Sequence, residues 1–266
     1  MASILDRIFT AKREEVDAQR RIKSLETVMA AAASAAPPRG FVAALRGRRP
    51  AIIAEVKRAS PSKGDILPGL DAAAVACDYA AAGAAAMSVL TDRHFKGTLE
   101  DLRTVRAACR LPLLRKDFMF DAYQVYEARA AGADCILLIA AMLAEDHLRE
   151  LTSIARDLRM AALVEVHSAA EFTLAGRIGA DLIGINNRDL HTFKTDIAVT
   201  EELIGGYNGG ALIVSESGIE TPAHIQRLTA AGARAFLIGE SLLRGGNPRA
   251  ALGALINTFA DAPAHK

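Results

Sequence analysis

The chain has 266 residues, 51% of them hydrophobic, which is enough for a large core and suits a single α/β barrel. Its 32 basic and 31 acidic residues give a formal net charge of +1, which argues against nucleic acid or an acidic membrane surface as partner. Cys77, Cys109 and Cys135 fit no disulfide framework or zinc spacing, so we expect reduced thiols in a cytoplasmic protein.

Residues 1–47 precede the repeated pattern that fills the rest of the chain. Their first residues contain no apolar segment of the signal-peptide kind, so we expect no signal peptide. Apolar residues at helical spacing among many charges predict an amphipathic helix at Ile4–Ile22, and an alanine-rich stretch with a hinge at 37–40 follows. We expect a helical extension packed on the barrel, either as a plug at one end or as a lid over the site.

Short apolar runs recur through residues 48–266 at intervals of roughly 20 to 35 residues, the length of one βα unit. Most are apolar throughout, as expected for parallel strands covered on both faces, and the longest apolar run, 135–144, is too short to span a membrane. The predicted strands are Ala51–Val56, Ala85–Leu90, Pro112–Arg115, Cys135–Ile139, Ala161–Val166, Leu182–Ile185, Leu212–Val214 and Ala235–Ile238.

Helical patterns alternate with these strands. They cover Asp71–Ala82, Leu99–Cys109, Asp121–Ala131, Glu145–Leu158, Ser168–Arg177 and Pro222–Ala231. Four junctions read Ala-Gly-Ala or Ile-Gly-Ala, where a glycine can adopt the left-handed turn that ends a helix. A doubly wound sheet is the alternative, but no G-x-G-x-x-G follows the first strand. We predict an α/β fold, a single (β/α)8 TIM barrel of residues 48–266 with an N-terminal helical extension.

Active sites of such barrels form where strands end and βα loops begin. The first strand ends in Glu55-Val56-Lys57, and because side chains alternate along a strand, Glu55 and Lys57 share a face that we expect to point into the barrel mouth. A structural salt bridge is the alternative. Three other strands end in polar residues at the same rim: Lys116, Glu165 and Asn186.

Two lysines and two glutamates in a partly dry site perturb one another's pKa values. A crowded lysine can become a usable proton donor near neutrality, and a shielded glutamate a usable base. Arg115 and Asp117 flank Lys116 on the opposite face, and we expect them to form structural ion pairs. Four histidines show no metal-ligand spacing, so we interpret them as ordinary loop residues and expect no metal: His94, His167, His191 and His224.

The last two predicted strands are followed by small residues. Ser217-Gly218 follows the seventh strand, and Gly239-Glu240-Ser241 follows the eighth. Small residues let backbone N–H groups approach a phosphate, with a helix N-terminus adding its dipole, and barrel phosphate sites occur after these two strands. We therefore expect a phosphorylated small-molecule substrate.

Taken together, these segments resemble the indole-3-glycerol phosphate synthase family, and the resemblance runs through the whole barrel. A helical N-terminal extension is also a trait of that family. The loop at 91–97 is shorter than the family's, which leaves a ring contact by Phe95 open. The segments that carry the resemblance are 55–64 (Glu-Val-Lys-Arg-Ala-Ser-Pro-Ser-Lys-Gly), 89–92, 114–118, 163–167, 184–190 and 215–219.

The resemblance implies closure of a carboxyphenylamino-deoxyribulose phosphate to an indole, with loss of carbon dioxide and water and without a metal or organic cofactor. It implies Lys116 as the general acid on the carbonyl and Glu165 as the base. Lys57 would bind the anionic substrate and donate a proton during water loss, and Glu55 would tune the lysines. How Lys57, Glu55 and Glu165 divide the later proton transfers stays open.

By the same resemblance, Asn186 and Ser217 orient the reacting groups and Phe118 packs on the aromatic ring. The implied substrate-binding residues are Ser60, Phe118, Arg188, Gly218, Gly239, Glu240 and Ser241.

Other functions remain open on the residues alone. A Schiff-base aldolase would explain Lys116 and the phosphate site but gives no role to Glu55, Lys57 and Asn186. A sugar-phosphate isomerase or a non-catalytic phosphometabolite-binding barrel are the others. We expect a monomer or a weak homodimer.

Overall fold

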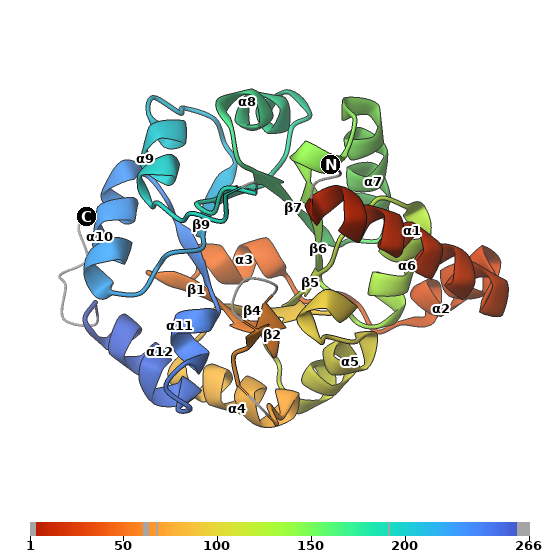
Figure 1. Cartoon of the computed structure of the whole chain (residues 1–266), viewed down its shortest axis with the longest axis horizontal. Helices are drawn as coiled ribbons and strands as arrows, with labels where there is room; N and C mark the ends of the chain where they lie inside the picture. The colour runs from red at the N-terminus through yellow and green to blue at the C-terminus, as the bar shows by residue number, and fades with distance from the viewer. Residues whose placement is uncertain (1–3, 61–63, 68, 191, 260–266) are drawn as a thin grey trace.

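The computed structural model describes residues 4–60, 64–67, 69–190 and 192–259. Within these ranges eight parallel strands close into a barrel, in the order β1-β10-β9-β8-β7-β6-β5-β4 (Figure 1). The strands are β1 (Ala51–Val56), β4 (Ala86–Leu90), β5 (Leu113–Lys116), β6 (Cys135–Ile139), β7 (Ala161–Val166), β8 (Leu182–Asn186), β9 (Leu212–Glu216) and β10 (Ala235–Ile238). The predicted TIM barrel is confirmed, with small shifts at the strand ends.

The predicted helices are present too: α4 (Ala72–Ala82), α5 (Leu99–Ala108), α6 (Ala122–Ala130), α7 (Glu145–Asp157), α8 (Ala169–Arg177) and α10 (Pro222–Ala231). Side-chain caps fix several starts, as where Thr98 and Asp101 form a reciprocal capping box on α5. The glycines of the four predicted stop signals, at positions 83, 132, 179 and 232, all have positive φ. The stop-signal prediction is therefore confirmed.

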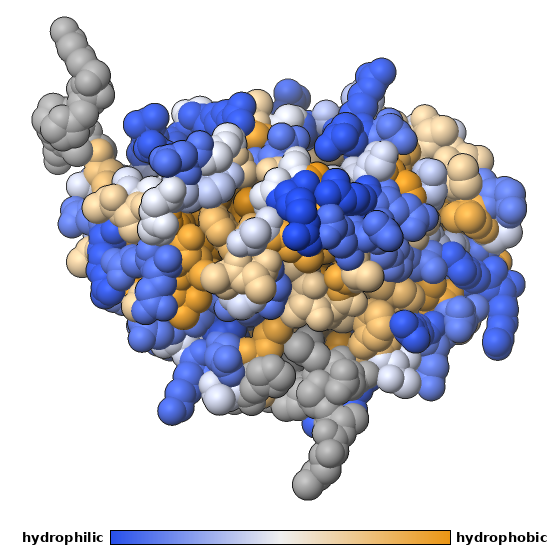
Figure 2. All heavy atoms as spheres, turned by 90° about the horizontal axis from the view of Figure 1, so that it is seen from above, coloured by the Kyte–Doolittle hydropathy of each residue, from blue (hydrophilic) through white to orange (hydrophobic). Residues whose placement is uncertain are grey.

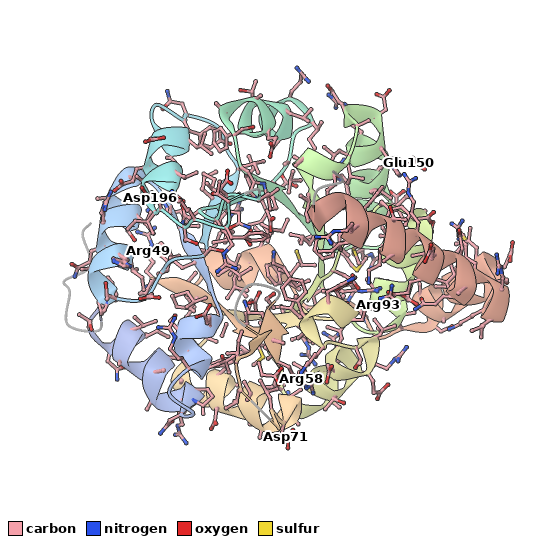
Figure 3. All side chains as sticks on the ribbon, in the orientation of Figure 1. Arg49, Arg58, Asp71, Arg93, Glu150 and Asp196 are labelled. Atoms are coloured by element: carbon pink, nitrogen blue, oxygen red, sulfur yellow. The ribbon has the colours of Figure 1, made fainter. Side chains whose placement is uncertain are left out.

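Several short elements and one helix of ten residues, α12 (Pro248–Asn257), were not predicted. The short elements are η1 (Arg93–Phe95), η2 (Ala140–Met142), α9 (Ala198–Ile204), α11 (Glu240–Leu243) and a hairpin of β2 (Ala59–Ser60) with β3 (Gly64–Asp65). The hairpin begins just after Arg58, which makes two hydrogen bonds of 2.7 Å to Asp101 of α5 (Figure 3). This pair ties the loop after β1 to the helix that follows the next barrel strand.

Apolar side chains fill both sides of the strands. Inside the barrel, Ile53, Leu114, Leu163 and Val214 are buried in one cluster. Outside, alternate strand residues pack under the helices in a second, larger cluster. Hydrophilic residues cover much of the face in Figure 2. Of the helices in the described ranges, none has the length and apolar character needed to cross a bilayer.

The N-terminal segment forms α1 (Ile4–Ile22), as predicted, then α2 (Leu25–Ser34) and α3 (Phe41–Arg46). Phe41 and Leu45 of α3 are buried in the interior cluster with residues at the strand starts, so α3 plugs that end of the barrel. Helix α1 lies at the opposite end, where Lys12 pairs with carboxylates beyond β4 and β5 (Figure 1). The extension thus supplies a plug and, separately, a cover on the rim.

Candidate active site

A cavity of about 290 Å³ opens at the carboxyl ends of the barrel strands. Because parallel strands end at one rim, residues far apart in sequence meet there. Charged side chains line this cavity. They are Glu55 of β1, Lys57 just after β1, Lys116 of β5, Glu165 of β7 and Glu216 of β9.

Glu55 and Lys57 form the pair that strand alternation predicts. The Nζ atom of Lys57 lies 2.6 Å from Oε1 of Glu55, and both side chains are largely buried. Val56 between them is buried in the outer cluster, under the helices. The two charged groups therefore share the inward face, as predicted.

Lys116, the last residue of β5, is held by two carboxylates. Its Nζ atom lies 2.6 Å from Oε2 of Glu165 and 3.3 Å from Oε2 of Glu216. Burial alone lowers the pKa of Lys116, but the charges of Glu165, Glu216 and Glu55 outweigh it and raise the pKa above its ordinary value. The expectation of a crowded lysine that titrates near neutrality is therefore wrong for Lys116, because carboxylates and not cations surround it.

Arg115 and Asp117 turn away from Lys116, as predicted. Arg115 lies 3.0 Å from Asp117 and 2.8 Å from Glu127 of α6. Burial alone lowers the pKa of Arg115, but the charges of Asp117 and Glu127 raise it above its ordinary value. Both residues are buried ion-pair members, and of the two only Asp117 also borders the cavity.

Glu165 of β7 is held as an anion. It accepts the hydrogen bond from Lys116 and one of 3.2 Å from Nδ2 of Asn186 at the end of β8. Burial would raise the pKa of Glu165, but the charge of Lys116, followed by that of His167, lowers it to about 2. Glu165 thus stays ionised in the cavity, and Asn186 is placed to orient it.

His167 departs from the loop-histidine interpretation. Its side chain is buried, with Nε2 3.4 Å from Oε1 of Glu165 and Nδ1 3.5 Å from Oε2 of Glu171. Burial lowers the pKa of His167, but the nearby carboxylates of Glu171 and Glu165 raise it overall. His191 lies outside the described residues, and groups of His, Cys, Asp and Glu suited to a metal do not occur in the part of the chain that is described.

Glu216, the last residue of β9, is the site residue that the sequence interpretation missed. It is 1% exposed, and its Oε1 has no hydrogen-bond partner among the described residues. Burial raises the pKa of Glu216 to about 7, with the charge of Glu165 adding to the effect and Lys116 opposing it. A β carbon on Gly184 of β8 would collide with this carboxylate, so glycine leaves the room that Glu216 occupies.

The loop after β9 has an unusual backbone. Ser217 and Gly218 both have positive φ, at 68° and 76°, which is rare for serine. Both residues line the cavity, as do Arg188, Glu240 and Ser241. Such backbone outliers concentrate at ligand-binding loops.

Gly239 also lines the cavity, but its nearest neighbour is Glu55. A side chain at Gly239 would collide with that carboxylate, so the tight packing at Gly239 is against the acid–base cluster. Ser241 donates a hydrogen bond of 3.0 Å to the carbonyl oxygen of Ile219, which joins the loops after β9 and β10. The carboxylate of Glu240 lies 2.7 Å from Arg244.

Aromatic rings also line the cavity, among them Phe193 of the loop after β8. Phe95 of η1 and Phe118 after β5 both line it, with ring centroids 6.3 Å apart. Ile8 of α1 lies in the same wall. Ser60 belongs to β2, and its side chain is outside the described part.

An eight-stranded barrel that gathers lysines and carboxylates in a cavity at its strand ends, with perturbed pKa values at Lys116, Glu165 and Glu216, is a (β/α)8-barrel enzyme of the acid–base kind. A model of the family described as indole-3-glycerol phosphate synthase matches residues 5–255. The chain belongs to the indole-3-glycerol phosphate synthase family.

Relatives named indole-3-glycerol phosphate synthase are similar along nearly the whole chain. One from Polaromonas sp. (strain JS666) is 48% identical over 96% of this chain and 98% of its own. Another, from Chromobacterium violaceum, is 46% identical over the same shares, and one from Acidithiobacillus ferrooxidans is 48% identical over 95% and 98%.

More distant solved structures share the fold alone. N-acetylmannosamine-6-phosphate 2-epimerase from Clostridium perfringens aligns with a TM-score of 0.58 at 15% identity, over 74% of this chain and 89% of that chain. Thiamine phosphate pyrophosphorylase from Pyrococcus furiosus aligns with a TM-score of 0.60 at 16% identity, over 81% and 98%.

Proposed function

We propose that the chain catalyses the conversion of 1-(2-carboxyphenylamino)-1-deoxyribulose 5-phosphate to indole-3-glycerol phosphate in tryptophan biosynthesis. Membership of the family supports this activity. The observation that carries the mechanism is the position of Lys116, a protonated amine in the cavity between Glu165 and Glu216.

Ring closure joins the aryl carbon that bears the carboxylate to the ketone carbon of the sugar. The ketone π electrons move onto oxygen, which takes a proton. Carbon dioxide then leaves, and the electrons of its carbon–carbon bond restore the aromatic ring. We assign the proton on oxygen to Lys116, because its raised pKa keeps it protonated at neutrality and the forming alkoxide is far more basic than an amine.

Dehydration needs an acid on the hydroxyl and a base at the methylene carbon beside nitrogen. We assign the acid to Lys57, which lies at the cavity wall beside Glu55, and the base to Glu165. Glu216 is an additional candidate for these transfers, since a carboxylate with a pKa of about 7 both accepts and releases protons near neutrality. Asn186 orients Glu165 through its hydrogen bond.

For binding, we assign the aryl group to the wall with Phe118 and the phosphate to the wall formed by the loops after β9 and β10. Arg188 is the cation that we assign to the phosphate, because its guanidinium borders the cavity near Thr195. The other residues assigned to the phosphate end are Ser217, Gly218, Gly239, Glu240 and Ser241. Ser60 remains a proposed contact of the loop after β1.

The aldolase alternative fits the geometry less well. A Schiff base requires a neutral amine, and the carboxylates around Lys116 raise its pKa and keep it charged. An isomerase would release no carbon dioxide, which separates it from the proposed reaction.

We further propose a cytoplasmic protein that is a monomer or a weak homodimer. Sedimentation of the purified chain would test the oligomeric state.

The test is the appearance of indole fluorescence when the purified chain meets the carboxyphenylamino substrate. Lys116→Met removes the proton but keeps the approximate volume, so kcat should fall about 10²–10⁴-fold, the usual contribution of a general acid. KM should change less, because Lys57 and the phosphate loops still hold the substrate. Wild-type kcat in Lys116→Met would overturn the assignment.

Two matched variants accompany this measurement. Arg115→Met removes a neighbouring cation that points away from the cavity, and it should lower stability before it affects kcat, since it leaves Asp117 and Glu127 without their buried partner. Lys57→Met should damage both kcat and KM, since this residue is assigned binding as well as chemistry.

A further inference from the structure

Lys12 is a buried cation that the proposed reaction does not use. It lies on the face of α1 that also carries Ile8 and Val16, and its exposed fraction is only 1%. A buried ammonium without partners would strongly destabilise a fold, so its position depends on the groups around it.

Carboxylates from two other elements surround this ammonium. Its Nζ atom lies 2.6 Å from Oδ2 of Asp92, 2.9 Å from Oδ1 of Asp117 and 3.2 Å from Glu15 on its own helix. Burial lowers the pKa of Lys12, but Asp117 and then Asp92 raise it overall, so the amine is charged. Nearby, Arg93 reaches Glu15 at 3.9 Å, and Figure 3 places Arg93 between α1 and α5.

Each aspartate also fixes a stretch of backbone that carries an aromatic ring. Oδ1 of Asp92 accepts hydrogen bonds from the backbone and ring of His94, at 2.8 and 2.9 Å, and so caps the turn that ends at Phe95. Oδ1 of Asp117 accepts a hydrogen bond of 2.9 Å from the backbone N–H of Phe118. One ammonium is thus paired with both carboxylates that hold the backbone of Phe95 and Phe118, two of the rings that line the cavity.

Helix α1 completes that wall one turn earlier. Ile8, four residues before Lys12 and on the same face, lines the cavity with Phe95 and Phe118. A shift of Lys12 would therefore move Ile8, η1 and the end of β5 relative to one another.

We propose that Lys12 is a positioning residue for the aryl end of the substrate pocket, which it shapes by locking α1 to Asp92 and Asp117. This inference rests on the proposed function, because it takes the aryl group to lie against Phe118. The phosphate end of the pocket is formed by other elements, the loops after β9 and β10, and serves as the internal reference.

Lys12→Met tests the inference. KM for the carboxyphenylamino substrate should rise about tenfold, the effect of weakened aromatic contact, while kcat stays within a factor of about three. Binding of 2-aminobenzoate, a probe for the aryl end, should weaken by a similar factor, and binding of inorganic phosphate should not change. Lys23→Met removes an exposed lysine just beyond α1 and is the matched control.

A second variant covers the case in which Lys12→Met does not fold. Lys12→Met with Asp92→Asn removes one buried negative charge and keeps a good capping residue for η1. It should fold and still show the raised KM, because Asp117 remains without its ammonium.

Two outcomes would overturn the inference: equal weakening of both probes, or unchanged binding of 2-aminobenzoate in a folded variant. Loss of the folded state in both variants would do so as well, since Lys12 would then serve folding alone. A wild-type chain that yields no indole product would instead refute the proposed function.

Discussion

Lys116 faces two carboxylates that differ in their affinity for a proton. Glu165 has Lys116 and Asn186 as hydrogen-bond donors and stays ionised, whereas Glu216 has one buried oxygen without a partner and a pKa of about 7. Near neutrality, Glu216 can gain or lose a proton while Lys116 and Glu165 remain charged. A reaction that needs an acid first and a base later can use that difference.

The raised pKa of Glu216 has a consequence for stability. The folded state binds this proton more tightly than the unfolded chain, whose pKa is the ordinary 4.5. The resulting stabilisation is complete below the ordinary pKa and is lost as pH rises toward about 7. We expect Glu216→Gln, which cannot ionise, to gain stability relative to the wild type between about pH 5 and about pH 8. Urea unfolding of both proteins at the two pH values measures this difference.

Glu165→Gln is the control of opposite sign. The pKa of Glu165 is lowered to about 2, so its ionised form stabilises the fold above its ordinary pKa of 4.5, and that contribution is lost only as pH falls toward 2. This variant should lose a similar amount of stability at both pH values. If the stability of Glu216→Gln ran parallel to the wild type across the range, the raised pKa would be wrong.

Strand alternation predicts most of the inward residues but was not carried to the end of β9. Val214 points into the barrel, so Glu216, two residues later, must point there as well. Lys12 carries a comparable signal, since it stands between Ile8 and Val16 on one helical face where an apolar residue is expected. What sequence could not supply is its pair of partners, Asp92 and Asp117, which only the folded barrel brings to α1.

At the scale of elements, β8 makes room for the end of β9. Gly184 lies next to the carboxylate of Glu216, and an added methyl group would occupy the position of Oε1. Gly184→Ala should therefore push Glu216 away from Lys116 and lower kcat, by about tenfold or more, while the barrel still folds. Steady-state kinetics with a thermal melt checks this.

Gly176→Ala is the control for that substitution. This glycine lies in α8, where an added β carbon meets nothing within 4 Å, so kcat should be unchanged. Equal kcat values in the two variants would show that the placement of Glu216 does not matter to the reaction.

Most long elements could be predicted from sequence, although the ten-residue α12 was not, and the short elements could not. The barrel strands are buried on both faces and the main helices carry caps and stop signals, so each of these elements can be recognised from its own stretch of sequence. Helix α3 has six residues, too few for a periodic pattern, and it is stable because Phe41 and Leu45 enter the barrel interior. The β2–β3 hairpin likewise depends on a tertiary contact, the hydrogen bond from Arg58 in the loop after β1 to Asp101 of α5.

For the whole molecule, we propose that residues 48–266 form the barrel domain and that residues 1–47 are an extension packed on it. Deleting residues 1–40 removes α1 and α2 but keeps the plug α3. A cooperative fold should persist with lower thermal stability, because Asp92 and Asp117 lose their buried ammonium. KM should rise because Ile8 leaves the cavity wall. Calorimetry and steady-state kinetics of the truncated chain measure both effects.

A longer deletion of residues 1–47 is the matched comparison. It also removes Phe41 and Leu45 from the barrel interior, and loss of one such large apolar side chain costs about 2–5 kcal/mol. This chain should be insoluble or fail to unfold cooperatively. Insolubility of the shorter deletion would mean instead that α1 and α2 are themselves required for folding.

The extension touches both ends of the barrel, and its partners come much later in the chain. Arg39 donates hydrogen bonds to the carbonyl oxygens of Cys109 and Leu111, and Lys12 pairs with Asp117. During synthesis the N-terminal residues leave the ribosome first, yet their docking surfaces do not exist until β5 and the turns around it have been made. The segment that is translated earliest can therefore dock in full only after residues as far along the chain as Asp117 have been made.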